Sequence, residues 1–149
     1  MKKNLFPILI LLIAGAIYAF NNFSPQNSNE SWTEKQLMNP ADLAKIVSDS
    51  SAKKPYIYSI GPAGMIPYSI AIGDAKEQEN LEKFKIQLNK LPKDADIVIY
   101  CGCCPFKDCP NIRPAFKLLN EMKFTNHKLL NLPKNLKVDW IDKGFPMNE

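Results

Sequence analysis

Concentrated positive charge is missing from this sequence. The formal net charge is +4, and Lys2 and Lys3 supply two of those charges, so +2 remains without them. Nucleic-acid-binding surfaces gather lysine and arginine into a patch or stripe, whereas the lysines here are spread along the chain and are not interleaved with aromatic residues. The composition therefore argues against nucleic acid as a partner.

Histidine is nearly absent, and cysteine is absent from most of the chain. We expect His127, the one histidine, to have a packing or surface role, because a cysteine–histidine pair would require the fold to bring the two together. All four cysteines lie between Cys101 and Cys109, so none is available to staple distant parts of the fold. No Cys-x-x-Cys-His occurs, which excludes covalent haem attachment.

The N-terminal segment is organised like an export signal. Lys2 and Lys3 precede an apolar run, 5–20, which gives way to a stretch rich in Asn, Ser, Pro and Gln. That order is typical of a secretory signal, and the run falls short of the roughly 20 residues that span a bilayer as a helix. We expect residues 1–20 to be a signal peptide or N-terminal membrane anchor and residues 21–35 to be a flexible linker, with Trp32 docking the linker on the domain. The domain, residues 36–149, is then exported: periplasmic, or anchored to the outer face of the inner membrane.

The remaining residues predict strands that alternate with helices. The expected strands are 56–60, a short one within 65–72, 97–100 and 127–132. The expected helices run from Pro40 to about 48–51, over 77–91, over 112–122 behind an Asn111 cap, and over 138–143 with an end at Gly144. This alternation predicts one α/β domain of three α/β/α layers around a central parallel sheet of four or five strands.

The cysteines lie where such a fold binds its ligands. Ile97–Tyr100 reads as a buried parallel strand, and Cys101 follows it directly, at the carboxyl end where ligands of parallel sheets bind. Cysteines clustered at one strand end indicate a site rather than a disulfide framework. A loop curling round Cys101 can aim peptide N–H groups at an anion, and the helix that follows Asn111 would lower the thiol pKa with its positive end.

In several motifs the chain resembles the rhodanese-like family. The first is Ile97–Cys101, followed by a loop and by a helix that contains Arg113 and Ala115. The second is the segment 66–70, and the third is the stretch 139–146, which contains Trp140. Together they cover roughly residues 36–147. The sequence departs from the family pattern in its longer loop, in Phe106 where an arginine usually stands, in Ser59-Ile60-Gly61 after the first core strand, and in the three extra cysteines.

The resemblance implies a sulfurtransferase without a cofactor. Cys101 would take a sulfane sulfur from a small anionic donor such as thiosulfate, become a persulfide, and pass the sulfur to a thiol acceptor. We expect a monomer that meets the membrane only through its N-terminal segment. The expected substrate-binding residues are Gly102, Cys103, Cys104, Lys107, Asn111 and Arg113.

The extra cysteines leave alternatives open. Cys103, Cys104 and Cys109 are candidates for a disulfide or a resolving thiol, because exported proteins meet an oxidising compartment. Together with Cys101 they are also candidate ligands of zinc or a soft ion. The second hypothesis is therefore a periplasmic thiol-redox or metal-binding module on a rhodanese scaffold, without sulfur transfer.

Overall fold

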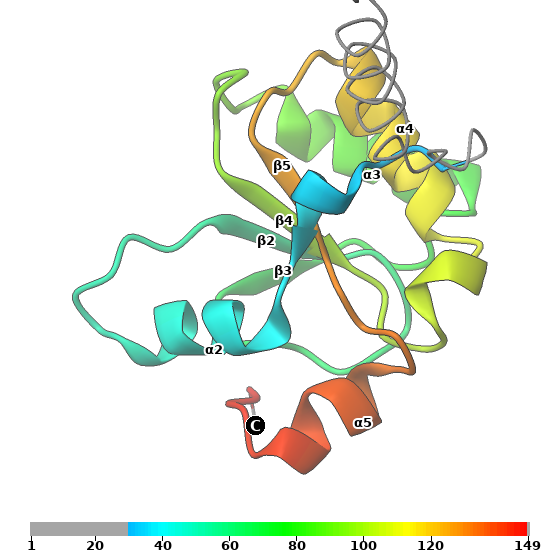
Figure 1. Ribbon diagram of the computed structural model, residues 1–149. Helices are drawn as coiled ribbons and strands as arrows, with labels where there is room; N and C mark the ends of the chain where they lie inside the picture. The colour runs from blue at the N-terminus through cyan, green and yellow to red at the C-terminus, as the bar shows by residue number, and fades with distance from the viewer. Residues whose placement is uncertain (1–29, 149) are drawn as a thin grey trace, which may run out of the picture.

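Five parallel strands form a single sheet at the centre of the molecule (Figure 1). The structure is a computed structural model and describes residues 30–148; the expected signal or anchor and residues 21–29 of the expected linker lie outside that range. The sheet order is β1-β5-β4-β2-β3, and every neighbouring pair is parallel. The strands are β1 (Leu37–Met38), β2 (Tyr56–Ser59), β3 (Ser69–Ala71), β4 (Ile97–Tyr100) and β5 (His127–Leu130).

Four α-helices cover the two faces of this sheet. They are α2 (Pro40–Ser48), α3 (Gln78–Leu88), α4 (Ile112–Glu121) and α5 (Leu136–Asp139). Three short 3-10 helices join them: η1 (Glu34–Gln36), η2 (Phe106–Asp108) and η3 (Ile141–Lys143). Helices α3 and α4 lie on one side and α2 and α5 on the other (Figure 1), so the predicted three-layer α/β/α architecture is confirmed, with five strands.

The alternation of side chains along β4 explains the two layers of core. Ile97 and Ile99 pack with the apolar faces of α3 and α4, whereas Val98 and Tyr100 pack with α2 and α5. Successive residues of a strand point to opposite faces, and all four residues of β4 are buried. The central strand is thus covered from both sides, which fixes its carboxyl end, and with it Cys101, in the middle of the molecule.

Most predicted boundaries hold, and the misses have local causes. Helix α2 begins at Pro40 as expected, with the Asn39 side chain accepting a hydrogen bond from the backbone N–H of Ala41 (2.9 Å). The short β1 was not predicted, because two residues are too few to show a period. The predicted helix 138–143 is wrong as one element: the backbone of Trp140 leaves helical geometry and separates α5 from η3. Gly144, in the left-handed region (φ 72°), ends η3 where an end was predicted.

Two residues with predicted packing roles are buried. The Trp32 ring lies 5.9 Å from Phe106 and 5.8 Å from Phe116, centroid to centroid. The ring of His127 packs on Phe116 at 4.7 Å, and burial lowers its pKa. Of the packing or surface role predicted for His127, the structure shows the packing role. Among residues 30–148, no helix has the length and apolar character needed to cross a bilayer.

Candidate active site

Cys101 follows the central strand directly and is almost fully buried, with 1% of its surface exposed. The loop after β2 closes over it, since the backbone N–H of Ile60 donates to the Tyr100 carbonyl at 2.9 Å. Gly61 then passes so near that a Cβ there would lie under 3.0 Å from the Cys101 sulfur. Only glycine leaves room for this thiol.

Hydrogen-bonding groups surround the sulfur inside this enclosure. The Cys103 sulfur lies 3.3 Å from it, and the side-chain amide of Asn111 donates to it, also at 3.3 Å. The sulfurs of Cys101, Cys103 and Cys109 all lie within 4.8 Å of one another. Cys109 is buried, whereas Cys103 is exposed, so the Cys103 side chain is the solvent-facing member of this three-sulfur cluster.

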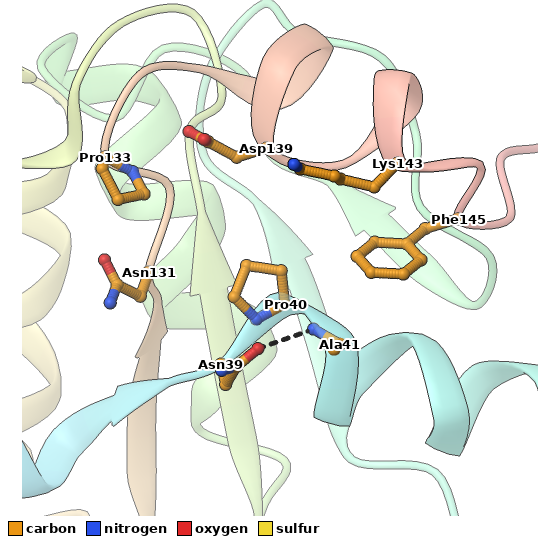
Figure 2. Close-up of a pocket in the computed structure, with 8 residues that line it drawn as sticks. All are labelled: Asn39, Pro40, Ala41, Asn131, Pro133, Asp139, Lys143 and Phe145. Atoms are coloured by element: carbon orange, nitrogen blue, oxygen red, sulfur yellow. Dashed lines mark hydrogen bonds between the residues drawn. The ribbon is translucent and has the colours of Figure 1, made fainter.

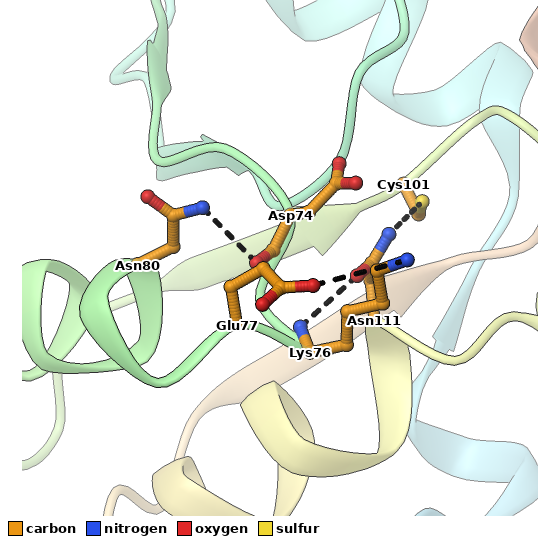
Figure 3. A network of polar contacts seen from close by, with 6 residues as sticks. All are labelled: Asp74, Lys76, Glu77, Asn80, Cys101 and Asn111. Atoms are coloured by element: carbon orange, nitrogen blue, oxygen red, sulfur yellow. Dashed lines mark hydrogen bonds and ion pairs between the residues drawn. The ribbon is translucent and has the colours of Figure 1, made fainter.

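The position of the Asn111 amide is fixed from its other end (Figure 3). Its carbonyl oxygen accepts a hydrogen bond from the backbone N–H of Lys76 at 3.0 Å. Because a peptide N–H can only donate, the oxygen must face Lys76 and the NH2 group must face Cys101. Asn111 occupies the N-cap position of α4 as predicted, but its side chain makes no capping bond to the helix and donates to the Cys101 sulfur instead.

These contacts separate the pKa values of the three thiols. The pKa of Cys101 is lowered to about 5, chiefly by the hydrogen bond from the Cys109 thiol. Burial acts in the opposite direction. Hydrogen bonds from Asn111 and from the backbone and thiol of Cys103 lower the pKa further. Burial, followed by hydrogen bonding to Cys101 and Cys104, raises the pKa of Cys103 to about 12. Donation to Cys101 and burial raise the pKa of Cys109. At neutral pH the cluster therefore carries one thiolate, on Cys101, and thiolate is the reactive form of cysteine.

The surroundings of Cys101 differ from the open cradle of peptide N–H groups that the sequence suggested. The backbone of Cys103 contributes, but a side-chain amide and two thiols supply the other contacts that lower the pKa. The sulfur is enclosed rather than open: Gly61 lies close against it, Cys103 and Asn111 contact it, and Cys101 is 1% exposed.

The cysteine loop is anchored to the segment that follows β5. Gly102 adopts φ 78°, a conformation that favours glycine, and a Cβ there would lie under 3.0 Å from Leu136 and Ala63. Its carbonyl accepts a hydrogen bond from the Leu136 backbone N–H at 2.9 Å. Farther along, the backbone N–H of Phe106 donates to the Leu132 carbonyl at 3.2 Å. Gly102 thus sets the turn of the loop.

The two predicted cationic residues brace the outer part of the loop. The guanidinium of Arg113 donates to the Lys107 carbonyl at 2.6 Å and lies 5.7 Å from the Trp32 ring centroid. The Lys107 ammonium lies 5.9 Å from the Phe106 ring centroid. These contacts direct both groups to the aromatic side of the loop, and their binding of an anionic donor stays a prediction.

Cys104 stands beside the three-sulfur cluster rather than in it. Its sulfur lies 3.2 Å from that of Cys103, and all four cysteines carry free thiols. The four-cysteine metal set considered from the sequence is thus reduced to Cys101, Cys103 and Cys109. Structural zinc takes four ligands, so three thiolates fit a soft ion such as Cu(I) better.

Besides the Lys76 backbone, two contributors to the site were missed in the sequence. One is Gly61, for which the signal was a glycine directly after a strand. The other is Tyr100, whose buried hydroxyl contacts the backbone N–H of Ile66 (3.0 Å), the Gly64 carbonyl (3.2 Å) and the Ser69 hydroxyl (3.1 Å). The residue just before Cys101 therefore holds the segment that follows Gly61.

A separate cavity of about 310 Å³ lies between the start of α2 and the C-terminal segment (Figure 2). Its lining residues are Asn39, Pro40, Ala41, Asn131, Pro133, Asp139, Lys143 and Phe145. No sulfur lines it, so it is distinct from the cysteine cluster.

The chain was also compared with known proteins. No family model and no curated protein matches it.

Proposed function

We propose that this protein is a sulfurtransferase that moves a sulfane sulfur from a small anionic donor, through a persulfide on Cys101, to a thiol acceptor. The single observation that carries the proposal is the hydrogen-bonded setting of the Cys101 sulfur at the end of the central strand. Asn111, Cys103 and Cys109 all favour the charged form of this thiol. A thiolate that persists at neutral pH is what attack on a sulfur donor requires.

The reaction balances without any redox partner. With thiosulfate, the Cys101 thiolate attacks the outer sulfur, a Cys101 S–S bond forms, the sulfur–sulfur bond of thiosulfate breaks, and sulfite leaves with its electron pair. An acceptor thiol then takes the terminal sulfur, and Cys101 departs as a thiolate. Its low pKa makes it a good leaving group, because thiols of lower pKa leave faster.

Membership of the rhodanese-like family and export from the cytoplasm belong to the same proposal. The supporting features are the cysteine that follows the central strand of a parallel α/β sheet and the apolar N-terminal run. A cell-fractionation assay of the full chain tests the second point.

The test is to expose the reduced protein to thiosulfate and measure its intact mass and the sulfite released. We expect one added sulfur atom per chain, localised to Cys101 by fragment-ion mass spectrometry, and one equivalent of sulfite. Cys101→Ser should show neither, whereas Cys104→Ser, which leaves the Cys101 contacts intact, should still release sulfite. Equal sulfite release from Cys101→Ser and wild type would refute the assignment.

A thiol-redox or metal-binding module is the second candidate. The observation that favours it is the approach of three sulfurs within 4.8 Å. Protein purified without reductant would then show the loss of two hydrogens, or a bound soft ion, and no sulfur adduct after thiosulfate. Native mass spectrometry separates these outcomes because each changes the mass differently.

A further inference from the structure

The cysteines of this site differ in their exposure to solvent. Cys101 is 1% exposed, its neighbour Cys103 is exposed, and 3.3 Å separates the two sulfurs. Cys109, the other thiol of the cluster, is fully buried, so it offers no route to solvent. Among the four cysteines, all of which the structure describes, only Cys103 both lies within 3.3 Å of the Cys101 sulfur and is exposed.

We propose that Cys103 is the first acceptor of the sulfane sulfur, which it takes from Cys101 and presents at the surface to an external thiol. This rests on the proposed function, since it presupposes the Cys101 persulfide. It assigns Cys103 the role of a relay nucleophile. The substrate class that follows is a bulky thiol, of a peptide or a protein, that reacts at the surface and never enters the enclosure.

The transfer step balances in atoms, charge and electrons. A proton moves from the Cys103 thiol to the terminal sulfur of the Cys101 persulfide anion. The Cys103 sulfur then attacks that terminal sulfur, a new S–S bond forms on Cys103, and the S–S bond on Cys101 breaks. Cys101 leaves as a thiolate and Cys103 becomes the persulfide. No oxidant or reductant is consumed.

The contacts favour this direction of transfer. The amide of Asn111 stays in place to receive the returning Cys101 thiolate at 3.3 Å, which makes Cys101 a good leaving group. Persulfide formation moves the negative charge from the Cys101 sulfur to the terminal sulfur. It thereby relieves one cause of the raised pKa of Cys103, its hydrogen bond to the Cys101 thiolate.

The competing reaction has a different product. If Cys103 attacked the inner sulfur, a Cys101–Cys103 disulfide would form and hydrosulfide would be released. That outcome removes two hydrogens from the chain, whereas the relay keeps one extra sulfur atom on it. Intact mass and a sulfide assay therefore distinguish the two.

The experiment compares acceptors of different size in wild type and Cys103→Ser. After thiosulfate, wild type should carry the added sulfur on Cys101 and, at later times, on Cys103. Cys103→Ser should still acquire it on Cys101 and pass it to cyanide, but should transfer it to glutathione at least tenfold more slowly than wild type. Cys104→Ser tests the adjacent thiol, whose sulfur lies 3.2 Å from that of Cys103: sulfur on Cys103 in this variant supports the relay, whereas transfer to glutathione as slow as in Cys103→Ser, with no sulfur on Cys103, would assign the role to Cys104 and overturn it.

The outcomes distinguish a failure of the Cys103 relay from a failure of the sulfurtransferase proposal. If Cys103→Ser transferred sulfur to glutathione at the wild-type rate, or if free sulfide and a disulfide were the products, the relay would be wrong while the Cys101 persulfide stood. If no variant retaining Cys101 gained a sulfur atom, the sulfurtransferase proposal itself would fail.

Discussion

The side-chain amide of Asn111 donates to the sulfur of Cys101 at 3.3 Å, and its orientation is fixed by the backbone N–H of Lys76. Asn111 is 2% exposed, so water does not substitute for it. A residue ten positions farther along the chain, at the start of α4, therefore adds to the lowering of the Cys101 pKa, after the Cys109 thiol.

Replacing this amide by a carboxylate should raise the pKa of Cys101. Asn111→Asp keeps an acceptor for Lys76 but turns an oxygen toward the sulfur. A hydrogen bond to a charged group contributes about 1.5–3 kcal/mol, and about 1.4 kcal/mol corresponds to one pKa unit, so we expect a rise of about one to two units. The measurement is the pH dependence of Cys101 alkylation, resolved by fragment-ion mass spectrometry. The exposed Asn89→Asp is the charge-matched control, and equal pKa values in both variants would contradict the role of Asn111.

The rate of persulfide formation should follow the ionisation of Cys101. Its pKa is lowered to about 5, so the thiolate is present above that pH and the rate should fall as the pH drops through about 5. The same lowering stabilises the folded state: the contribution is complete above the ordinary thiol pKa and is lost as the pH falls through about 5. Single-turnover sulfite release between pH 4 and 8 checks the rate. A midpoint near the ordinary thiol pKa would contradict the prediction.

Gly61→Ala should slow persulfide formation on Cys101 and destabilise the fold. The new methyl group would overlap the sulfur, and overpacking of this kind costs about 1–3 kcal/mol. We expect a lower urea midpoint and at least tenfold slower persulfide formation. Gly64→Ala is the matched control, because the methyl group there meets the end of the flexible Met147 side chain. The idea fails if both variants form persulfide equally fast.

Tyr100→Phe should destabilise the fold. Removal of the hydroxyl leaves the buried backbone N–H of Ile66 without its partner, at a cost of about 1–3 kcal/mol. Tyr56→Phe, at a half-exposed position, should change the free energy of unfolding by less than about 0.5 kcal/mol. Urea denaturation of both variants measures the difference, and similar midpoints would argue against a structural role for the hydroxyl.

More of the fold than of the candidate site could be predicted from the sequence. The run Ile97–Tyr100 is continuously apolar and rich in β-branched residues, which indicates a buried strand, and the apolar face of α4 repeats with the period of a helix, so local patterning identified both. The cysteine cluster was also visible, because its members are adjacent in the chain. The contacts of Gly61 and Lys76 with the site were not visible, since they come from loops after other strands that only the parallel sheet brings to Cys101. Asn111 was assigned to a helix cap because its local position suits that role. In the structure its side chain instead hydrogen-bonds to Cys101 and to the backbone of Lys76.

The hydrogen bond from Leu136 to Gly102 has a consequence for the order of assembly. The loop that carries the reactive thiol rests on α5, which follows β5 in the chain, so its final shape depends on residues that the ribosome adds after the loop itself. Until α5 has been made and has docked, Cys101 lacks this support. Truncation of the chain before Leu136 should therefore abolish the reactive centre even where the sheet still forms.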